Sequence, residues 1–148
     1  MRRCSLTHGF DTSFLVAAEV AEHAEHPAAR ARLQALRQAG DTFALAPQVL
    51  AEFVHVVTDA KRFSQPLAMN EALDRAEIWW NAPEIEQVTP DAEAMRLFLD
   101  WMRAHQLGRK RVLDTMLATT FRSAGISSVL TTNARDFATF GGFNLVAP

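Results

Sequence analysis

The segment RKRVLDTMLA, residues 109–118, sets one acidic residue into an apolar helical pattern. The i, i+4, i+7, i+8, i+11 spacing of a buried helix face is occupied by Leu113, Leu117, Thr120, Phe121 and Ala124. Asp114 lies one residue, or about 100° of helix rotation, from that face. We therefore expect its carboxylate at the edge of the core, partly desolvated and able to point inward.

Two interpretations of this segment stay open from its residues alone. In a purely structural role, Asp114 would complement the positive dipole of the helix N-terminus from the first turn. Arg109, Lys110 and Arg111 lie where the same dipole disfavours cations, so their position favours a site that an anion such as a phosphate visits. A solvated basic face is the alternative for these three cations.

The rest of the chain alternates short strand patterns with longer helical ones. The patterns predict strands at residues 5–10, 42–45, 85–88, 126–130 and 143–146. Helices are predicted between the strands, at residues 14–20, 27–39, 47–60, 69–81 and 91–105, in addition to the helix of the opening segment. A polar turn is expected at 131–137. This order implies an α/β fold in which helices cover a mostly parallel sheet of four to five short strands.

Composition and charge restrict the class of protein. The chain has the 148 residues of one domain, and we treat 1–148 as a single domain. The single Cys4 excludes an internal disulfide, and no apolar run approaches the roughly 20 residues of a membrane span. Because MRRCSLTHGF lacks a hydrophobic stretch, we expect no signal peptide and a cytoplasmic protein. With a net charge of -2, nucleic-acid binding must rest on local basic patches.

Several acidic and amide residues are predicted to lie at the carboxyl ends of the strands, where a parallel sheet forms its ligand-binding sites. Asp11, Asn133 and Asp136 directly follow predicted strands, and Glu52 and Asp114 lie near the starts of helices that return to the same edge. Two carboxylates ~4 Å apart repel by about 4 kcal/mol at an effective dielectric of about 20, so such a cluster needs compensating charge. Oxygen ligands favour Mg²⁺ or Mn²⁺, which would polarise a phosphodiester held against them.

Some of these residues also have structural interpretations. Glu52 interrupts the apolar face of its helix, and a buried carboxylate without a partner is costly. It therefore contacts a cation, a metal or water in a cleft, or else it leans out at the edge of the face. Thr12 or Ser13 would cap the helix that follows, and Asp11 suits the same role.

Two pairs of side chains are better explained by structure than by chemistry. Two adjacent tryptophans such as Trp79 and Trp80 are able to stack on bases. We favour instead a structural role for them, at an edge of the core or in a subunit interface. His23 and His26 flank a polar break before a proline, and we interpret them as solvated residues rather than metal ligands.

Four motifs occur in the order and at the spacing of a known family. They are DTS at Asp11, APQVLAEF around Glu52, VLDTMLATT around Asp114 and LTTNARDF around Asn133. Together they resemble the PIN-domain nucleases and, within them, the VapC toxins of bacterial toxin–antitoxin pairs. The resemblance extends to the closing GGFNLVAP and implies a three-layer α/β/α fold over nearly the whole chain.

The resemblance also implies an activity and a set of partners. It implies a Mg²⁺- or Mn²⁺-dependent endoribonuclease that leaves a 5′-phosphate and a 3′-hydroxyl, forms a homodimer and is neutralised by a cognate antitoxin. Asp11, Glu52 and Asp114 correspond to the metal ligands. Asn133 stands at a position that is often acidic, so one charge is missing there, and Asp136 partly replaces it through water.

The residues expected to contact RNA are the hydroxyl and basic side chains near these acids. They are Thr12, Ser13, Arg109, Lys110, Arg111 and Thr132. Two other functions stay open: a PIN-type nuclease of RNA processing or of DNA, and a degenerate PIN domain that binds RNA or a partner without cutting. The neutral Asn133 keeps the second of these under consideration.

Overall fold

Five parallel strands form the centre of the protein in a computed structural model that describes residues 4–148. The strands are β1 (Thr7–Phe10), β2 (Thr42–Leu45), β3 (Ile85–Gln87), β4 (Ser128–Leu130) and β5 (Asn144–Val146). Their order across the sheet is β3-β2-β1-β4-β5, and every neighbouring pair is parallel. The predicted sheet is therefore confirmed, and within the described residues it is parallel throughout.

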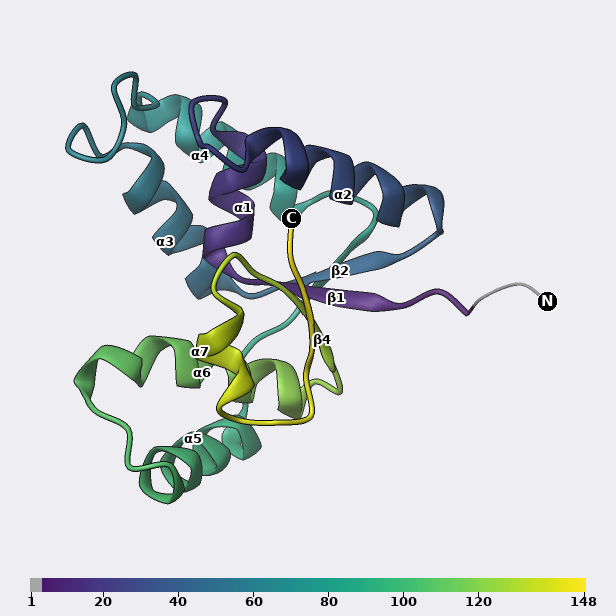
Figure 1. Cartoon of the computed structure of the whole chain (residues 1–148), viewed down its shortest axis with the longest axis vertical. Helices are drawn as coiled ribbons and strands as arrows, with labels where there is room; N and C mark the ends of the chain where they lie inside the picture. Colours follow the sequence, from purple (N-terminus) through teal and green to yellow (C-terminus); the bar gives the residue numbers. More distant parts are fainter. Residues whose placement is uncertain (1–3) are drawn as a thin grey trace.

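Helices cover both faces of this sheet (Figure 1). One layer contains α1 (Thr12–Glu19), α2 (His26–Gln38), α3 (Pro47–Val57) and α4 (Met69–Trp80). The opposite layer contains α5 (Ala92–Ala104), α6 (Val112–Ser123) and α7 (Ala134–Ala138). In the first layer α1 contacts α2 and α3, and in the second α6 contacts α5 and α7. This is the predicted three-layer α/β/α arrangement. No helix in residues 4–148 is long and apolar enough to cross a bilayer.

Two local predictions differ from the structure. The expected polar turn at 131–137 contains the short helix α7, whose Phe137 is buried in the core. The basic residues Arg109–Arg111 form a separate 3-10 turn, and α6 begins only after it.

The predicted buried face of α6 is right in its middle and wrong at its ends. Leu117, Thr120 and Phe121 are buried, but Leu113 is 74% exposed and Ala124 is also exposed. The cause is that the core reaches only the middle turns of α6, whereas its first turn extends toward solvent. A helical period identifies a face, but it carries no information about how far along the helix that face is covered.

Aromatic side chains fill the core on the α1–α4 side of β1. The ring of Phe10 stacks on Phe43 at 5.0 Å between centroids and meets the edge of Trp79 at 5.2 Å. The indole Nε1 of Trp79 donates to Glu19 Oε1 at 2.7 Å. Trp79 is therefore a buried residue of this core, which agrees with the first of the two expected roles, a core edge. Its neighbour Trp80 is only partly buried.

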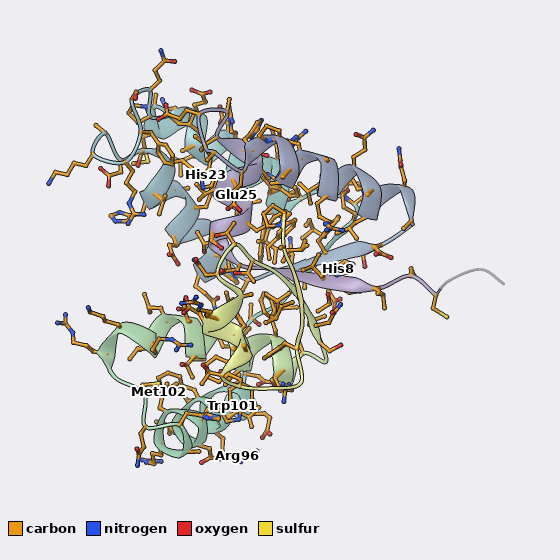
Figure 2. The ribbon with its side chains drawn as sticks, viewed as in Figure 1. His8, His23, Glu25, Arg96, Trp101 and Met102 are labelled. Carbon is orange, nitrogen blue, oxygen red and sulfur yellow. The ribbon has the colours of Figure 1, made fainter. Side chains whose placement is uncertain are left out.

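A buried histidine joins three strands at the amino-terminal edge of the sheet. His8 Nε2 lies 2.8 Å from Asp41 Oδ2, and His8 Nδ1 lies 2.6 Å from Ser128 Oγ. The other oxygen of Asp41 accepts from the backbone N–H of Leu6 at 3.0 Å. His8 lies on the central strand (Figure 2). These bonds link β1 to the segment before β2 and to the start of β4, at the end of the sheet opposite to Asp11.

Close approach of β1 and α6 depends on Gly9. A Cβ atom added at Gly9 would lie 2.7 Å from Cζ of Phe121, and the Phe121 side chain is fully buried. The missing side chain lets α6 pack directly against the central strand. The distance between the end of β1, which carries Asp11, and α6, which carries Asp114, is set by this contact.

Gly9→Ala should destabilise the protein by roughly 1–3 kcal/mol, because the added methyl overpacks a core that cannot move aside easily. The midpoint of urea unfolding measures this change. Gly108→Ala is the matched control, since a Cβ at Gly108 meets no atom within 4 Å and its φ of -95° suits alanine. Equal midpoints for the two variants would contradict the proposed close approach.

Candidate active site

One pocket of about 460 Å³ brings together the acidic and amide residues predicted from the sequence. Its lining includes Asp11, Glu52, Asp114, Asn133 and Asp136. These residues come from four separate parts of the chain: the end of β1, α3, α6 and the segment between β4 and α7. The hydroxyl residues Thr12, Ser13 and Thr132 also line it. We call this the acid pocket.

Asp11 is fixed at the centre of the acid pocket by two hydroxyl groups. Its Oδ2 accepts from Ser13 Oγ at 2.8 Å and from Thr131 Oγ1 at 2.7 Å. Its backbone N–H donates to the carbonyl of Leu130 at 2.9 Å, which continues the pairing of β1 with β4. Asp11 is the N-cap residue of α1, but its side chain makes no capping hydrogen bond. The carboxylate is therefore held in place by these hydroxyl groups and does not cap α1.

The segment after β4 is tied to the same carboxylate. Ser13 Oγ accepts from the backbone N–H of Thr132 at 3.1 Å, and Thr131 Oγ1 accepts from the N–H of Asn133 at 2.9 Å. These bonds position Asn133, which begins α7 without a side-chain cap, at the pocket. Sequence reasoning missed Thr131 as a site residue. Its place as the first residue after a predicted strand, as for Asp11, was the available signal.

Glu52 leans out of the helix face that it interrupts. The residue is exposed and also lines the acid pocket, so leaning out of the apolar face and facing a cleft describe the same position. Its Oε2 accepts from Thr12 Oγ1 at 3.2 Å. Thr12 and Ser13 thus direct their hydroxyls toward carboxylates, and neither caps α1.

The carboxylates of the pocket disfavour each other's ionisation. Burial and then the negative charges of Asp11 and Asp136 raise the pKa of Asp114 to about 6, although the guanidinium of Arg111 opposes them. Burial also raises the pKa of Asp11, against the hydrogen bonds from Thr131 and Ser13 that favour its charged form. The pocket therefore holds more negative charge than its own cations compensate.

Removal of the Asp114 charge should stabilise the metal-free protein at neutral pH. With a pKa of about 6 against the ordinary 3.8, the folded state binds more protons between these values, so stability falls as pH rises through them. In EDTA, Asp114→Asn should therefore melt roughly 2–8 °C above the wild type at about pH 7.5, and no higher than the wild type at about pH 3.5.

The control for this measurement is Asp74→Asn, which removes an exposed carboxylate of α4. It should leave the melting temperature unchanged at both pH values. A wild-type-like melting temperature of Asp114→Asn at neutral pH would contradict the crowding of charge at Asp114.

The predicted basic segment lies outside the acid pocket. Arg109 and Lys110 are exposed on the 3-10 turn, and none of Arg109–Arg111 lines the pocket. Arg111 is engaged elsewhere: its Nη2 donates to the carbonyl of Asp136, and its guanidinium lies 5.8 Å from the ring centre of Phe140. Arg111 therefore holds α7 against the start of α6.

Three side chains from turns and loops also line the acid pocket, and the sequence did not indicate them as partners of the acids. They are His23, Arg62 and Phe63, from the turn after α1 and the loop after α3. His23 lies in the turn with Glu25 (Figure 2), whose backbone N–H donates to His23 Nδ1 at 3.0 Å. Arg62 is the cation of this lining, and its Nε lies 3.5 Å from Asp59 Oδ2. Loop residues do not follow the regular spacing of apolar residues that marks a helix or a strand. The sequence therefore does not indicate which loops lie near a site.

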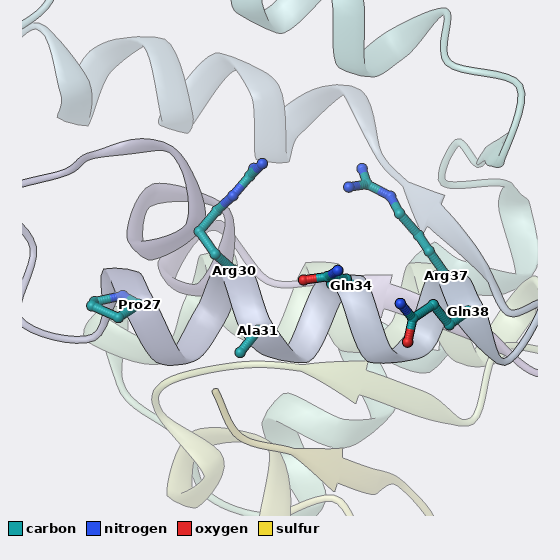
Figure 3. A pocket seen from close by; sticks show the side chains of 6 residues that line it. All are labelled: Pro27, Arg30, Ala31, Gln34, Arg37 and Gln38. Atoms are coloured by element: carbon teal, nitrogen blue, oxygen red, sulfur yellow. The ribbon is translucent and has the colours of Figure 1, made fainter.

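A larger pocket of about 630 Å³ follows the exposed side of α2 (Figure 3). Its charged groups are Arg30 and Arg37, and Arg37 already pairs with Glu84 at 3.2 Å between Nη2 and Oε1. No carboxylate or nucleophile belongs to its lining. Although it is larger, it offers no group for hydrolysis, and the acid pocket is the candidate active site.

The acid pocket suits a hard divalent cation in its chemistry. Its acidic ligands offer only oxygen, which Mg²⁺ and Mn²⁺ prefer, and a cation would relieve the repulsion that raises the pKa of Asp114. Among residues 4–148, however, no three His, Cys, Asp or Glu side chains converge closely enough to form a ready-made metal site.

Solved structures with the same fold come from bacterial toxin–antitoxin systems. The chain is similar to VapC20 of Mycobacterium tuberculosis, a sarcin-ricin loop cleaving toxin, with a TM-score of 0.71, 21% identity, and 95% and 98% of the two chains covered. It is also similar to VapBC2 of Rickettsia felis bound to a promoter DNA fragment, with a TM-score of 0.70, 16% identity, and 97% and 99% covered.

A third similar structure is VapBC-1 of nontypeable Haemophilus influenzae, with a TM-score of 0.65, 12% identity, and 96% and 98% covered. At these identities the likeness demonstrates the fold. No curated protein sequence matches the chain. The family model of the PIN domain matches residues 10–142, which include every residue of the acid pocket, the strands β2, β3 and β4, and the last residue of β1, whereas β5 follows the matched segment. The chain therefore belongs to the PIN domain family.

Proposed function

We propose that this protein is a metal-dependent endoribonuclease, the toxin of a VapBC-type toxin–antitoxin pair. The observation that carries the proposal is the convergence of Asp11, Glu52 and Asp114 in one pocket, where burial and then the negative charges of neighbouring carboxylates raise the pKa of Asp114 to about 6. Carboxylates so placed destabilise each other unless a cation joins them, and enzymes commonly use such clusters to bind a metal for catalysis.

Asp11, Glu52 and Asp114 would hold one Mg²⁺ or Mn²⁺. When bound, the cation supplies Lewis-acid polarisation of a phosphoryl oxygen and a lowered pKa for a neighbouring water. The hydroxyls of Ser13 and Thr131 keep Asp11 oriented through the 2.8 Å and 2.7 Å bonds to its Oδ2.

Asn133 and Asp136 extend the oxygen lining on the α7 side of the pocket. Asn133 adds a neutral amide oxygen, and Asp136 adds a negative charge that Asp114 senses. Water attacks the phosphorus in line, the bond to the 3′-oxygen breaks, and that oxygen takes up the proton. The products are a 5′-phosphate and a 3′-hydroxyl.

The toxin role rests on the fold and its neighbours. The similar structures include a toxin that cleaves the sarcin-ricin loop and two VapBC structures. We infer a cognate antitoxin that covers the acid pocket, a homodimer as the assembled form, and action on RNA in the cytoplasm. Co-expression tests this inference directly, because the chain alone should arrest bacterial growth and its antitoxin should restore it.

The cleavage assay uses purified protein on total bacterial RNA with Mg²⁺, Mn²⁺ or EDTA. Cleavage should require the metal, and Asp11→Asn and Asp114→Asn should each reduce it by more than the roughly 10- to 100-fold that loss of a residue behind a metal ligand causes. Thr131→Val, which removes one hydrogen bond to Asp11, should fall within that range.

Asp74→Asn is the control for this series, because Asp74 is an exposed acid of α4 and should leave the rate unchanged. Equal cleavage in EDTA, or by the Asp114→Asn protein, would refute the metal-dependent mechanism.

Basic residues around the acid pocket would bind the phosphates that flank the cut. Arg62 lines the pocket, and Arg109 and Lys110 are exposed on the turn before α6. The slope of log affinity for single-stranded RNA against log salt is negative, and it should become less negative by about 0.7 for Arg62→Ala and by about 1.4 for the Arg109→Ala, Lys110→Ala double variant.

These slopes are measured in EDTA, so that binding is separated from cleavage. Lys61→Ala is the control, since Lys61 is an exposed cation next to Arg62 that does not line the pocket. Slopes that match the wild type for both sets of residues would assign the phosphate contacts to other cations.

A second candidate function is an RNA-binding PIN domain that does not cut. It is favoured by the neutral Asn133 and by the lack, within residues 4–148, of three acidic or histidine side chains already converged for a metal. The two functions differ in one readout: the non-cutting protein binds RNA with the same salt dependence but yields no products with any metal.

A further inference from the structure

A second pocket lies against the same carboxylates. Its volume is about 440 Å³, and it shares Asp11, Thr12, Glu52 and Asp114 with the acid pocket. The remainder of its lining is largely apolar and comes from the first turns of α3 and α6 and the segment before α5: Val49, Ala51, Pro90, Leu113, Met116 and Leu117. The carboxylates thus form a wall between a polar pocket and an apolar one.

Leu113 marks the mouth of the apolar pocket. Its side chain is 74% exposed, although it belongs to the helix turn that carries Asp114, directly beside the candidate metal ligands. Because Leu113 also lines the apolar pocket, its exposed side chain is available to a ligand that enters there. Its position in the lining distinguishes it from Ile78, which is similarly exposed but lines neither the acid pocket nor this one.

We propose that the apolar pocket binds the nucleobase of a nucleotide adjoining the phosphate that is cut. This inference rests on the proposed function, because the phosphate held at the carboxylates fixes where the neighbouring nucleoside lies. A base is planar, uncharged and largely apolar on its faces, so it can lie against a wall of carboxylates where a phosphate or an acidic side chain cannot. Enzymes that act on extruded bases hold them between apolar side chains in this way.

Polar recognition of the base is available in the same pocket. The side chain of Gln48 belongs to the lining, and its Nε2 reaches Thr120 Oγ1 only at 3.4 Å, near the limit of a hydrogen bond. An amide carries both donors and an acceptor, which matches the mixed edge of a nucleobase. Gln48 therefore contributes to the choice of base.

Size and shape favour a single nucleoside over a protein segment. The volume of about 440 Å³ lies within the roughly 300–1,000 Å³ of sites for small organic ligands. A partner helix needs a long groove with anchors at several successive turns, but the lining here comprises one or two turns of each helix. It follows that the RNA must be unpaired at this nucleotide, since a base stacked in a duplex cannot enter.

The test uses the full chain with Mg²⁺ and a short synthetic RNA that spans a cut mapped on total bacterial RNA. Abasic nucleotides replace, one at a time, the residues on each side of the cut. One of these substitutions should lower kcat/KM by roughly 10- to 150-fold, as the loss of one buried apolar group of this size does.

Leu113→Ala should lower kcat/KM on the intact RNA and make the enzyme nearly indifferent to that same abasic nucleotide, because the two changes remove one contact. Ile78→Ala is the matched control, since Ile78 is 71% exposed, lies on α4 and does not line the pocket. A thermal melt verifies that both variants fold like the wild type.

Three results overturn the inference. Wild-type enzyme that cuts every abasic RNA equally well has no base pocket, although its nuclease function stands. Leu113→Ala that cuts normally but escapes neutralisation by a co-expressed antitoxin assigns the pocket to the protein partner. No cleavage of any RNA with any metal overturns the proposed function itself, and the base pocket with it.

Discussion

Parallel pairing of β1 with β2 on one side and β4 on the other determines where the acids lie. The hydrogen bond from Asp11 N–H to the Leu130 carbonyl extends the β1–β4 ladder one residue past the strand, so that Asp11 and Thr131 meet side by side. Gly9 then lets α6 approach the same strand through Phe121. The separation of Asp11 and Asp114 is thus fixed by backbone contacts in the core, which are stiffer than any surface side chain.

The acid pocket combines several features that oppose folding. Asp11 is 8% exposed, and burial raises its pKa and that of Asp114. The chain offsets this cost only in part, with hydroxyl donors from Thr12, Ser13 and Thr131 and the guanidinium of Arg111. The rest of the core is apolar and well packed. Unfavourable electrostatics that a fold retains at a single site usually reflect a functional constraint on that site.

Much of this arrangement was predictable, and the failures have physical causes. The strands and helices were predicted from the spacing of apolar residues. The five acidic or amide positions were predicted from their places after strands or near the starts of helices. The helical wheel could not reveal that α3 exposes Glu52 or that α6 exposes Leu113, because exposure depends on where neighbouring layers end. Trp79 fitted both a core edge and a subunit interface, because a sequence does not indicate that Glu19 satisfies its indole N–H in the core. Thr131 was overlooked because a residue that orients another has no motif of its own.

The pairing of β1, near the start of the sequence, with β4, near its end, has a consequence for folding during translation. His8 meets Ser128, and Asp11 meets Thr131, across 120 positions in each case. Contacts of such sequence separation form only after both partners have emerged from the ribosome, and they form late in folding. A nascent chain that lacks β4 holds Asp11 without the hydroxyl that orients it and without the strand that completes the sheet. Asp11 and Thr131 can therefore meet, and the acid pocket can form, only after β4 has been synthesised and has paired with β1.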